Sequence, residues 1–141
     1  MCKYIASVAK SDLYPVGDHY TRSVVDQWMD FASIHIGRWT STVLFEKVFK
    51  SKFGMGESDE EKVKDATKFF NQQAAVINDH FSDKKYFVGE KMTIADIFMF
   101  AYLETAPICG LNLEDHKNLH SWKSSMDDQV FVNTVKEKYS I

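Results

Sequence analysis

The stretch of sequence that decides the fold is residues 86–97, which reads YFVGEKMTIADI. Thr93 is suited to cap the N-terminus of a helix, and Asp96 follows three residues later. With this spacing each side chain accepts a hydrogen bond from the other residue's backbone N–H, which is a capping box. Met92 and Ile97 flank the pair with the spacing of a hydrophobic staple. The stretch therefore predicts that a helix begins at residue 94.

The helix predicted to follow, residues 94–109, has an uncharged and mainly apolar run from Ile97 to Leu103. A helix that is apolar nearly all round is typical of the centre of a bundle. Elsewhere, apolar residues recur at spacings of three and four, which is the pattern of amphipathic helices. This pattern predicts further helices over residues 18–52, 59–81, 114–126 and 127–139.

Two of these helices carry more detailed expectations. Gly37 lies inside the longest one and predicts a bend or a break there. In the last helix the apolar residues that share one face are Val130, Phe131, Val135 and Tyr139. Together the patterns predict an all-α fold, a bundle of five or six helices.

The composition agrees with this fold class and excludes several others. The 141 residues suit one domain, and 6 Gly with 2 Pro are too few for the many turns of a β-sandwich. The net charge of −3 gives no basic excess for nucleic acid. No apolar run approaches the ~18 residues of a membrane span, and 2 Cys suit a reducing compartment. We therefore expect a cytoplasmic protein with no nucleic-acid or membrane partner.

The first 17 residues read differently from the rest. Residues 1–9 have the apolar spacing of the last turns of a helix, and residues 11–18 have the Pro and Gly of a linker. We expect residues 1–17 to be the end of a preceding domain plus a linker, and residues 18–141 to be a helical domain.

Candidate chemical groups are few. His116 and His120 are four residues apart, a spacing that can hold a metal, but a solvated helix start with acidic residues at its N-terminus is the far commoner arrangement. Cys109 follows Pro107 near a helix C-terminus, where the helix dipole disfavours a thiolate, so we expect a buried structural cysteine. The sequence thus predicts no catalytic residue and no metal site.

Residues 35–40 form the stretch with the most functional character. His35, Arg38 and Trp39 bring an imidazole, a guanidinium and an indole to a predicted helix bend. One reading is a core Trp beside an exposed Arg. The other is the wall of a cleft for an apolar ligand. The residues alone leave both readings open.

Residues 86–97 resemble the signature (F/Y)-(L/V)-x-G-(D/E)-x-(L/M/F)-T-(L/I)-A-D-(I/L) of the glutathione transferase C-terminal domain. The resemblance extends over the whole chain. Residues 4–15 are similar to the end of the thioredoxin-like domain and its linker, and residues 25–31 to the start of the first helix of the helical domain. Residues 45–55 look like the end of that helix in phi-like and bacterial members, and residues 110–122 resemble the closing helix.

The resemblance implies a division of labour. In this family the thioredoxin-like domain binds glutathione, the co-substrate, and carries the group that activates its thiol. We therefore expect that domain as a partner, no bound cofactor, and no activity from this chain alone. We also expect an exposed apolar patch, bordered by residues 1–9, on the face that meets it. The helical domain would supply the site for a small apolar electrophile, which the resemblance places at His35, Ile36, Trp39 and Thr40. Arg38 is the fifth expected binding residue, and the resemblance directs it toward the carboxylates of glutathione or toward a partner subunit.

Two further expectations follow from the family. Its members act in detoxification as homodimers, so we expect a homodimer here. The same helical domain also serves as a non-catalytic assembly module in translation elongation factors and aminoacyl-tRNA synthetases. That alternative predicts protein partners in place of a small substrate.

Overall fold

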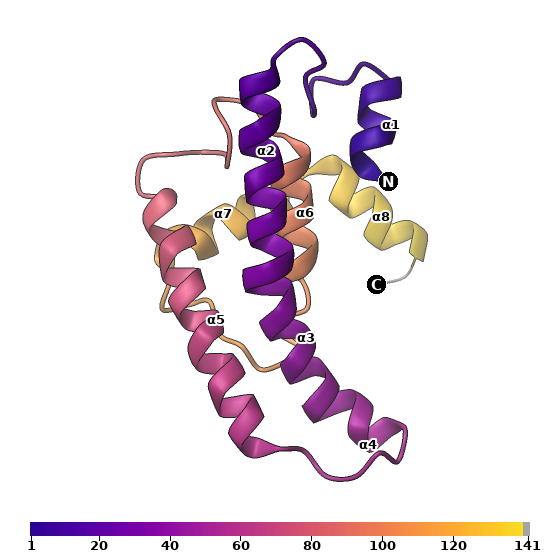
Figure 1. Cartoon of the computed structure of the whole chain (residues 1–141), viewed down its shortest axis with the longest axis vertical. Helices are drawn as coiled ribbons and strands as arrows, with labels where there is room; N and C mark the ends of the chain where they lie inside the picture. Colours follow the sequence, from indigo (N-terminus) through magenta and orange to yellow (C-terminus); the bar gives the residue numbers. More distant parts are fainter. Residues whose placement is uncertain (140–141) are drawn as a thin grey trace.

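The computed structural model describes residues 1–139, and all of their regular structure is helical (Figure 1). This confirms the predicted all-α class. The helices are α1 (Cys2–Val8), α2 (His19–Phe31), α3 (Arg38–Leu44), α4 (Lys50–Lys52), α5 (Glu60–His80), α6 (Ile94–Leu103), α7 (Lys117–Asp127) and α8 (Val130–Tyr139). Within the described residues, no helix is both long enough and apolar enough to cross a membrane.

Helices α2, α3 and α4 are parts of one continuous long helix over residues 19–52, so the described elements group into six helices. Two π-helical segments, Ala32–Gly37 and Phe45–Phe49, join the three α-helical parts. Asp18 caps the N-terminus by accepting a hydrogen bond from the backbone N–H of Thr21 at 2.9 Å. At Gly37, where the sequence predicts a bend or a break, the helix does not break, but its α-helical hydrogen bonding gives way to π-helical hydrogen bonding over Ala32–Gly37.

Helix α6 lies at the centre of the bundle. It packs along α2 and the first π-helical segment, while α5 packs along α3 and α7 closes the other side of α5 (Figure 1). The largest fully buried side chains come from all of these elements and include Phe70, Ile36, Ile77, Met99 and Leu103. Burial of such side chains is the main stabilising term of the fold.

The start of α6 is built as the sequence predicts. The carboxylate of Asp96 accepts hydrogen bonds from the backbone N–H of Thr93 at 2.8 Å and from its hydroxyl at 3.0 Å. It also accepts one from the backbone N–H of Phe87 at 3.0 Å, which ties the preceding segment to the helix. Asp96 has no exposed surface, and burial raises its pKa although these hydrogen bonds oppose the rise.

Helix α6 is shorter than predicted. It ends at Leu103 and is followed by turns over residues 104–110, whereas the sequence predicted helix to residue 109. Gly110 ends these turns with a φ of 70°. The helix expected from residue 114 begins at Lys117.

Helix α8 is present, but its predicted apolar face points to solvent. Val130, Phe131, Val135 and Tyr139 are 81%, 38%, 46% and 64% exposed, respectively. The buried residue of α8 is Val132. The helix therefore rests on the bundle through a small contact and leaves its apolar stripe uncovered.

Candidate functional site

The five residues expected to line a ligand site lie in different environments. Ile36 and Thr40 are 0% and 1% exposed, because they occupy the core-facing side of the long helix. His35 and Arg38 are exposed, and Trp39 is half-buried. Ile36 and Thr40 thus offer no surface to a ligand in this structure. For His35, Arg38 and Trp39 the lining role stays a prediction.

Trp39 is the centre of a small aromatic patch between α3 and α5. Its ring stacks on Phe69 with a centroid distance of 4.8 Å and an interplanar angle of 19°. The guanidinium carbon of Arg38 lies 4.7 Å from the Trp39 ring, a cation–π distance. His35 instead lines a shallow hollow on α2 with Phe31, at a ring centroid distance of 4.9 Å. The structure thus joins Arg38 to Trp39, and it places His35 against Phe31 in a hollow that neither of them lines.

The most apolar cavity that we found lies between α1 and α6, with a volume of about 440 Å³, and we call it the α1–α6 groove. Its walls come from α1, the linker and α6. They are Cys2, Ile5, Ala6, Ala9, Ser11, Leu13, Ile94, Ile97, Phe98 and Ala101. Phe98 also borders a second hollow of about 390 Å³ between α1 and α2. The volume of the α1–α6 groove falls in the range of ligand-binding pockets.

Helix α1 continues the apolar surface beyond the α1–α6 groove. Met1, Tyr4, Ile5 and Val8 are 93%, 71%, 57% and 66% exposed, and Ala6 is its buried residue. An exposed apolar patch bordered by residues 1–9 is what the sequence predicts. A contiguous surface of this kind marks a contact with another protein or a ligand.

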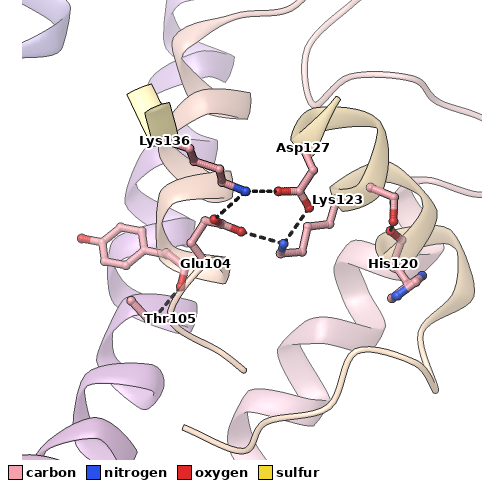
Figure 2. Close-up of polar contacts among 8 residues, drawn as sticks. Glu104, Thr105, His120, Lys123, Asp127 and Lys136 are labelled. Atoms are coloured by element: carbon pink, nitrogen blue, oxygen red, sulfur yellow. Dashed lines mark hydrogen bonds and ion pairs between the residues drawn. The ribbon is translucent and has the colours of Figure 1, made fainter. Parts of the chain in front are cut away.

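Four charged side chains form a closed network at the junction of α6, α7 and α8 (Figure 2). Lys123 contacts Glu104 at 2.6 Å and Asp127 at 2.9 Å. Lys136 of α8 contacts the same two carboxylates, Asp127 at 2.9 Å and Glu104 at 3.5 Å. Each of the four charges has two partners of opposite sign. The network therefore holds α8 on the bundle, and none of its charged groups is left unpaired for catalysis.

The pKa shifts in this network have clear causes. Burial alone would lower the pKa of Lys123, but its hydrogen bonds to Glu104 and Asp127 outweigh burial and raise it. Burial acts to raise the pKa of Asp127, and the contacts with Lys136 and Lys123 lower it overall. Both shifts favour the ionised pair, as expected for a structural contact.

Neither histidine of the considered metal pair joins this network. The ring of His120 points away from the four charges in Figure 2. Residues 1–139 contain no group of three or more His, Cys, Asp or Glu side chains placed to hold a metal ion. His116 is the residue that precedes α7 and makes no side-chain cap to it.

The two thiols differ in environment. Cys109 is buried, its Sγ donates a hydrogen bond to the backbone oxygen of Thr40 at 3.4 Å, and burial raises its pKa. A raised pKa is the opposite of what a nucleophilic thiol needs, so Cys109 fits its expected structural role. Cys2 is exposed at the rim of the α1–α6 groove.

Sequence reasoning missed polar contacts that organise the surroundings of these surfaces. Glu46, 4% exposed, accepts hydrogen bonds from the backbone N–H of Asp59 at 2.9 Å and from Lys50 at 2.6 Å. These contacts lower the pKa of Glu46 and fix the loop before α5. The sequence signal that could have indicated this role is the position of the charged Glu46 on the apolar face of the long helix. Tyr14 and Asp26 form another such contact, which no spacing indicates.

The six-helix fold with a capping box at the start of its central helix defines one class of helical domain. Comparisons with known proteins identify the family to which this domain belongs. The family described as "Glutathione S-transferase, C-terminal domain" matches residues 35–129. The chain therefore belongs to the glutathione S-transferase C-terminal domain family.

Solved structures share the fold at low sequence identity. Glutathione S-transferase-I bound with lactoylglutathione has a TM-score of 0.85 at 20% identity, over 95% of this chain and 65% of that one. Glutathione transferase F2 from Populus trichocarpa has a TM-score of 0.85 at 16% identity, over 99% and 67%. A glutathione S-transferase from Xanthobacter autotrophicus Py2 has a TM-score of 0.76 at 18% identity, over 89% and 60%. The chain thus spans 60–67% of the length of these proteins.

Proposed function

We propose that this chain is the helical half of a glutathione transferase together with the last helix of its thioredoxin-like domain, α1, and that the α1–α6 groove seats the rest of that domain. The observation that carries the proposal is the uncovered apolar surface made by the groove and by Tyr4, Ile5 and Val8 of α1. Burying this surface against a second domain would be favourable by about 25 cal/mol per Å² of apolar area. Family membership supports a thioredoxin-like domain as the partner.

The reaction of the complete protein would be attack of the glutathione thiolate on an electrophilic carbon of a small apolar substrate. The thiolate forms the new carbon–sulfur bond, and the leaving group departs with its electron pair. In the proposal this chain excludes water and positions the electrophile, a contribution that can be large for a bimolecular step. The partner domain supplies glutathione binding and activation of the thiol, which need a donor near the sulfur.

The proposed co-substrate wall is the exposed part of residues 35–40. Trp39 and Phe69 provide a flat apolar surface, and Arg38 beside them provides a cation for an electron-rich or anionic substituent. Pairing of two copies into a homodimer is part of the proposal. Sedimentation at rising protein concentration tests that part, and a monomer at every concentration would contradict it.

The first test uses the chain alone. Calorimetry with glutathione should show no measurable binding, and a conjugation assay with 1-chloro-2,4-dinitrobenzene should show no activity. Submillimolar binding of glutathione that Arg38→Ala abolishes would mean that this half has its own thiol site, and it would overturn the proposed division of labour.

The second test restores the partner. The chain replaces the matching part of poplar glutathione transferase F2, which includes the counterpart of α1, and the folded chimera is assayed for conjugation. Activity that Trp39→Ala reduces, while the exposed variant Val76→Ala does not, would support the proposal. A folded but inactive chimera would contradict it and favour the assembly-module alternative.

A further inference from the structure

The linker between α1 and α2 is held by five polar side chains that we call the linker clamp. They are Lys3, Ser7, Tyr14, Arg22 and Asp26. Lys3 and Ser7 lie one turn apart on α1, and Arg22 and Asp26 lie one turn apart on α2. The two pairs face each other. Lys3 Nζ lies 3.0 Å from an Asp26 carboxylate oxygen, and Arg22 donates a hydrogen bond to the Ser7 hydroxyl at 3.2 Å.

Tyr14 of the linker lies between these two contacts. Its hydroxyl donates to the two carboxylate oxygens of Asp26 at 2.9 and 3.1 Å. The guanidinium carbon of Arg22 lies 4.1 Å from the centre of the Tyr14 ring. The side chain is 4% exposed, so the phenol is held on both its polar and its aromatic side. Tyr14 and Asp26 are therefore the centre of the clamp.

Apolar packing alone is a weak support for α1. The helix has seven residues, fewer than an isolated helix needs to be stable in water, and Ala6 is its buried residue. The linker is anchored separately, because the backbone oxygen of Leu13 accepts a hydrogen bond from the N–H of Ile94 at 2.9 Å. Polar contacts thus fix α1 to α2, and the linker that follows α1 to the start of α6.

We propose that Tyr14 and Asp26 are positioning residues that hold α1, the expected end of the thioredoxin-like domain, against α2 and thereby set how the rest of that domain docks in the α1–α6 groove. The inference rests on the proposed function for the identity of the partner. The clamp itself rests only on the contacts given above. If the linker clamp is broken, α1 can move away from α6 and the groove opens. A domain seated in the groove then no longer has one fixed orientation.

The first arm of the test uses the chain alone and amide hydrogen exchange. Tyr14→Phe and Asp26→Asn should each speed exchange of the Cys2–Val8 amides about tenfold or more, the factor expected when a hydrogen bond to a charged acceptor is lost. Exchange in α5 should stay unchanged. The matched control is Asp30→Asn, which removes the same charge one turn further along α2. If Asp26→Asn and Asp30→Asn exchange alike in α1, the clamp does not exist.

The second arm measures docking in the chimera with the poplar F2 thioredoxin-like domain. Asp26→Asn should lower kcat/KM about tenfold, whereas its unfolding midpoint should equal that of Asp30→Asn. Faster α1 exchange with unchanged kcat/KM would overturn the link from the clamp to docking. An inactive unsubstituted chimera would instead overturn the proposed function, and the exchange measurements would then decide on the clamp by themselves.

Discussion

The ring of Tyr102 packs directly on the backbone of Gly37, so that a Cβ atom at position 37 would lie 2.4 Å from the Cε1 atom of Tyr102. Such a distance is far below van der Waals contact. The contact is where α6 crosses the end of the first π-helical segment. A Cβ atom at position 37 would therefore force the Tyr102 ring to move, so the constraint on this residue is space and not backbone conformation.

This contact predicts that Gly37→Ala destabilises the protein. Overpacking typically costs about 1–3 kcal/mol, and the better helix propensity of Ala returns up to about 1 kcal/mol. We expect a net loss of about 1–2 kcal/mol in the free energy of unfolding, measured by urea denaturation. Tyr102→Ala should make Gly37→Ala tolerable or stabilising. Gly17→Ala, where a Cβ meets nothing within 4 Å, is the control and should change little.

Asp96→Ala should be more damaging than the loss of an ordinary helix cap. It leaves the buried backbone N–H groups of Thr93 and Phe87 without acceptors, and each such group costs about 1–3 kcal/mol. We expect the free energy of unfolding to fall by about 2–4 kcal/mol. Asp65→Ala on the exposed side of α5 serves as the control. An unchanged denaturant midpoint for Asp96→Ala would refute the structural role of this carboxylate.

His80 should make stability fall as the pH drops below about 7, close to the unfolded pKa of histidine. Burial beside the rings of Trp28, Phe81 and Phe87 lowers its pKa, so the folded protein prefers the neutral imidazole. Its contribution is complete above the unfolded pKa of about 6.5 and declines as the pH falls through the folded pKa. Urea denaturation at several pH values should show this decline, and His80→Gln should flatten it.

The charge network at α8 should respond to salt. The Lys136 side chain is 36% exposed, so its two contacts are partly screened by ions. Raising NaCl from 50 mM to 1 M should speed amide exchange in α8 about two- to fivefold, the range of partly exposed ion pairs. Lys136→Met should exchange fast at both salt concentrations, whereas Lys138→Met should behave as wild type. A salt response that persists in Lys136→Met would show that this network does not hold α8.

Local sequence signals predicted the fold well because they act between residues close in the chain. The capping box of Thr93 and Asp96 spans three residues, and its geometry follows from helix geometry alone. The contacts of Asp96 with Phe87 and of Tyr14 with Asp26 join residues 9 and 12 positions apart across a turn. No periodicity encodes such contacts, so sequence reasoning left them out.

The candidate site and α8 show that the spacing of residues predicts which side chains share a helix face but does not predict whether that face is buried. Spacing correctly placed Phe131, Val135 and Tyr139 on one face of a helix, but only the neighbouring helices decide whether a face is buried. Likewise, the resemblance grouped residues 35–40 without regard to their burial. In the structure Ile36 and Thr40 face the core, Trp39 is half-buried against it, and Arg38 is exposed.

The two π-helical segments have a consequence for evolutionary comparison. A π-helical turn closes its hydrogen bonds over five residues instead of four, so each segment acts as a one-residue insertion in the long helix. A relative with a regular helix here aligns correctly only with a single-residue gap at Ala32–Gly37 and another at Phe45–Phe49. An ungapped alignment places every homologous position beyond each segment about 100° around the helix axis, and it pairs core residues with surface ones.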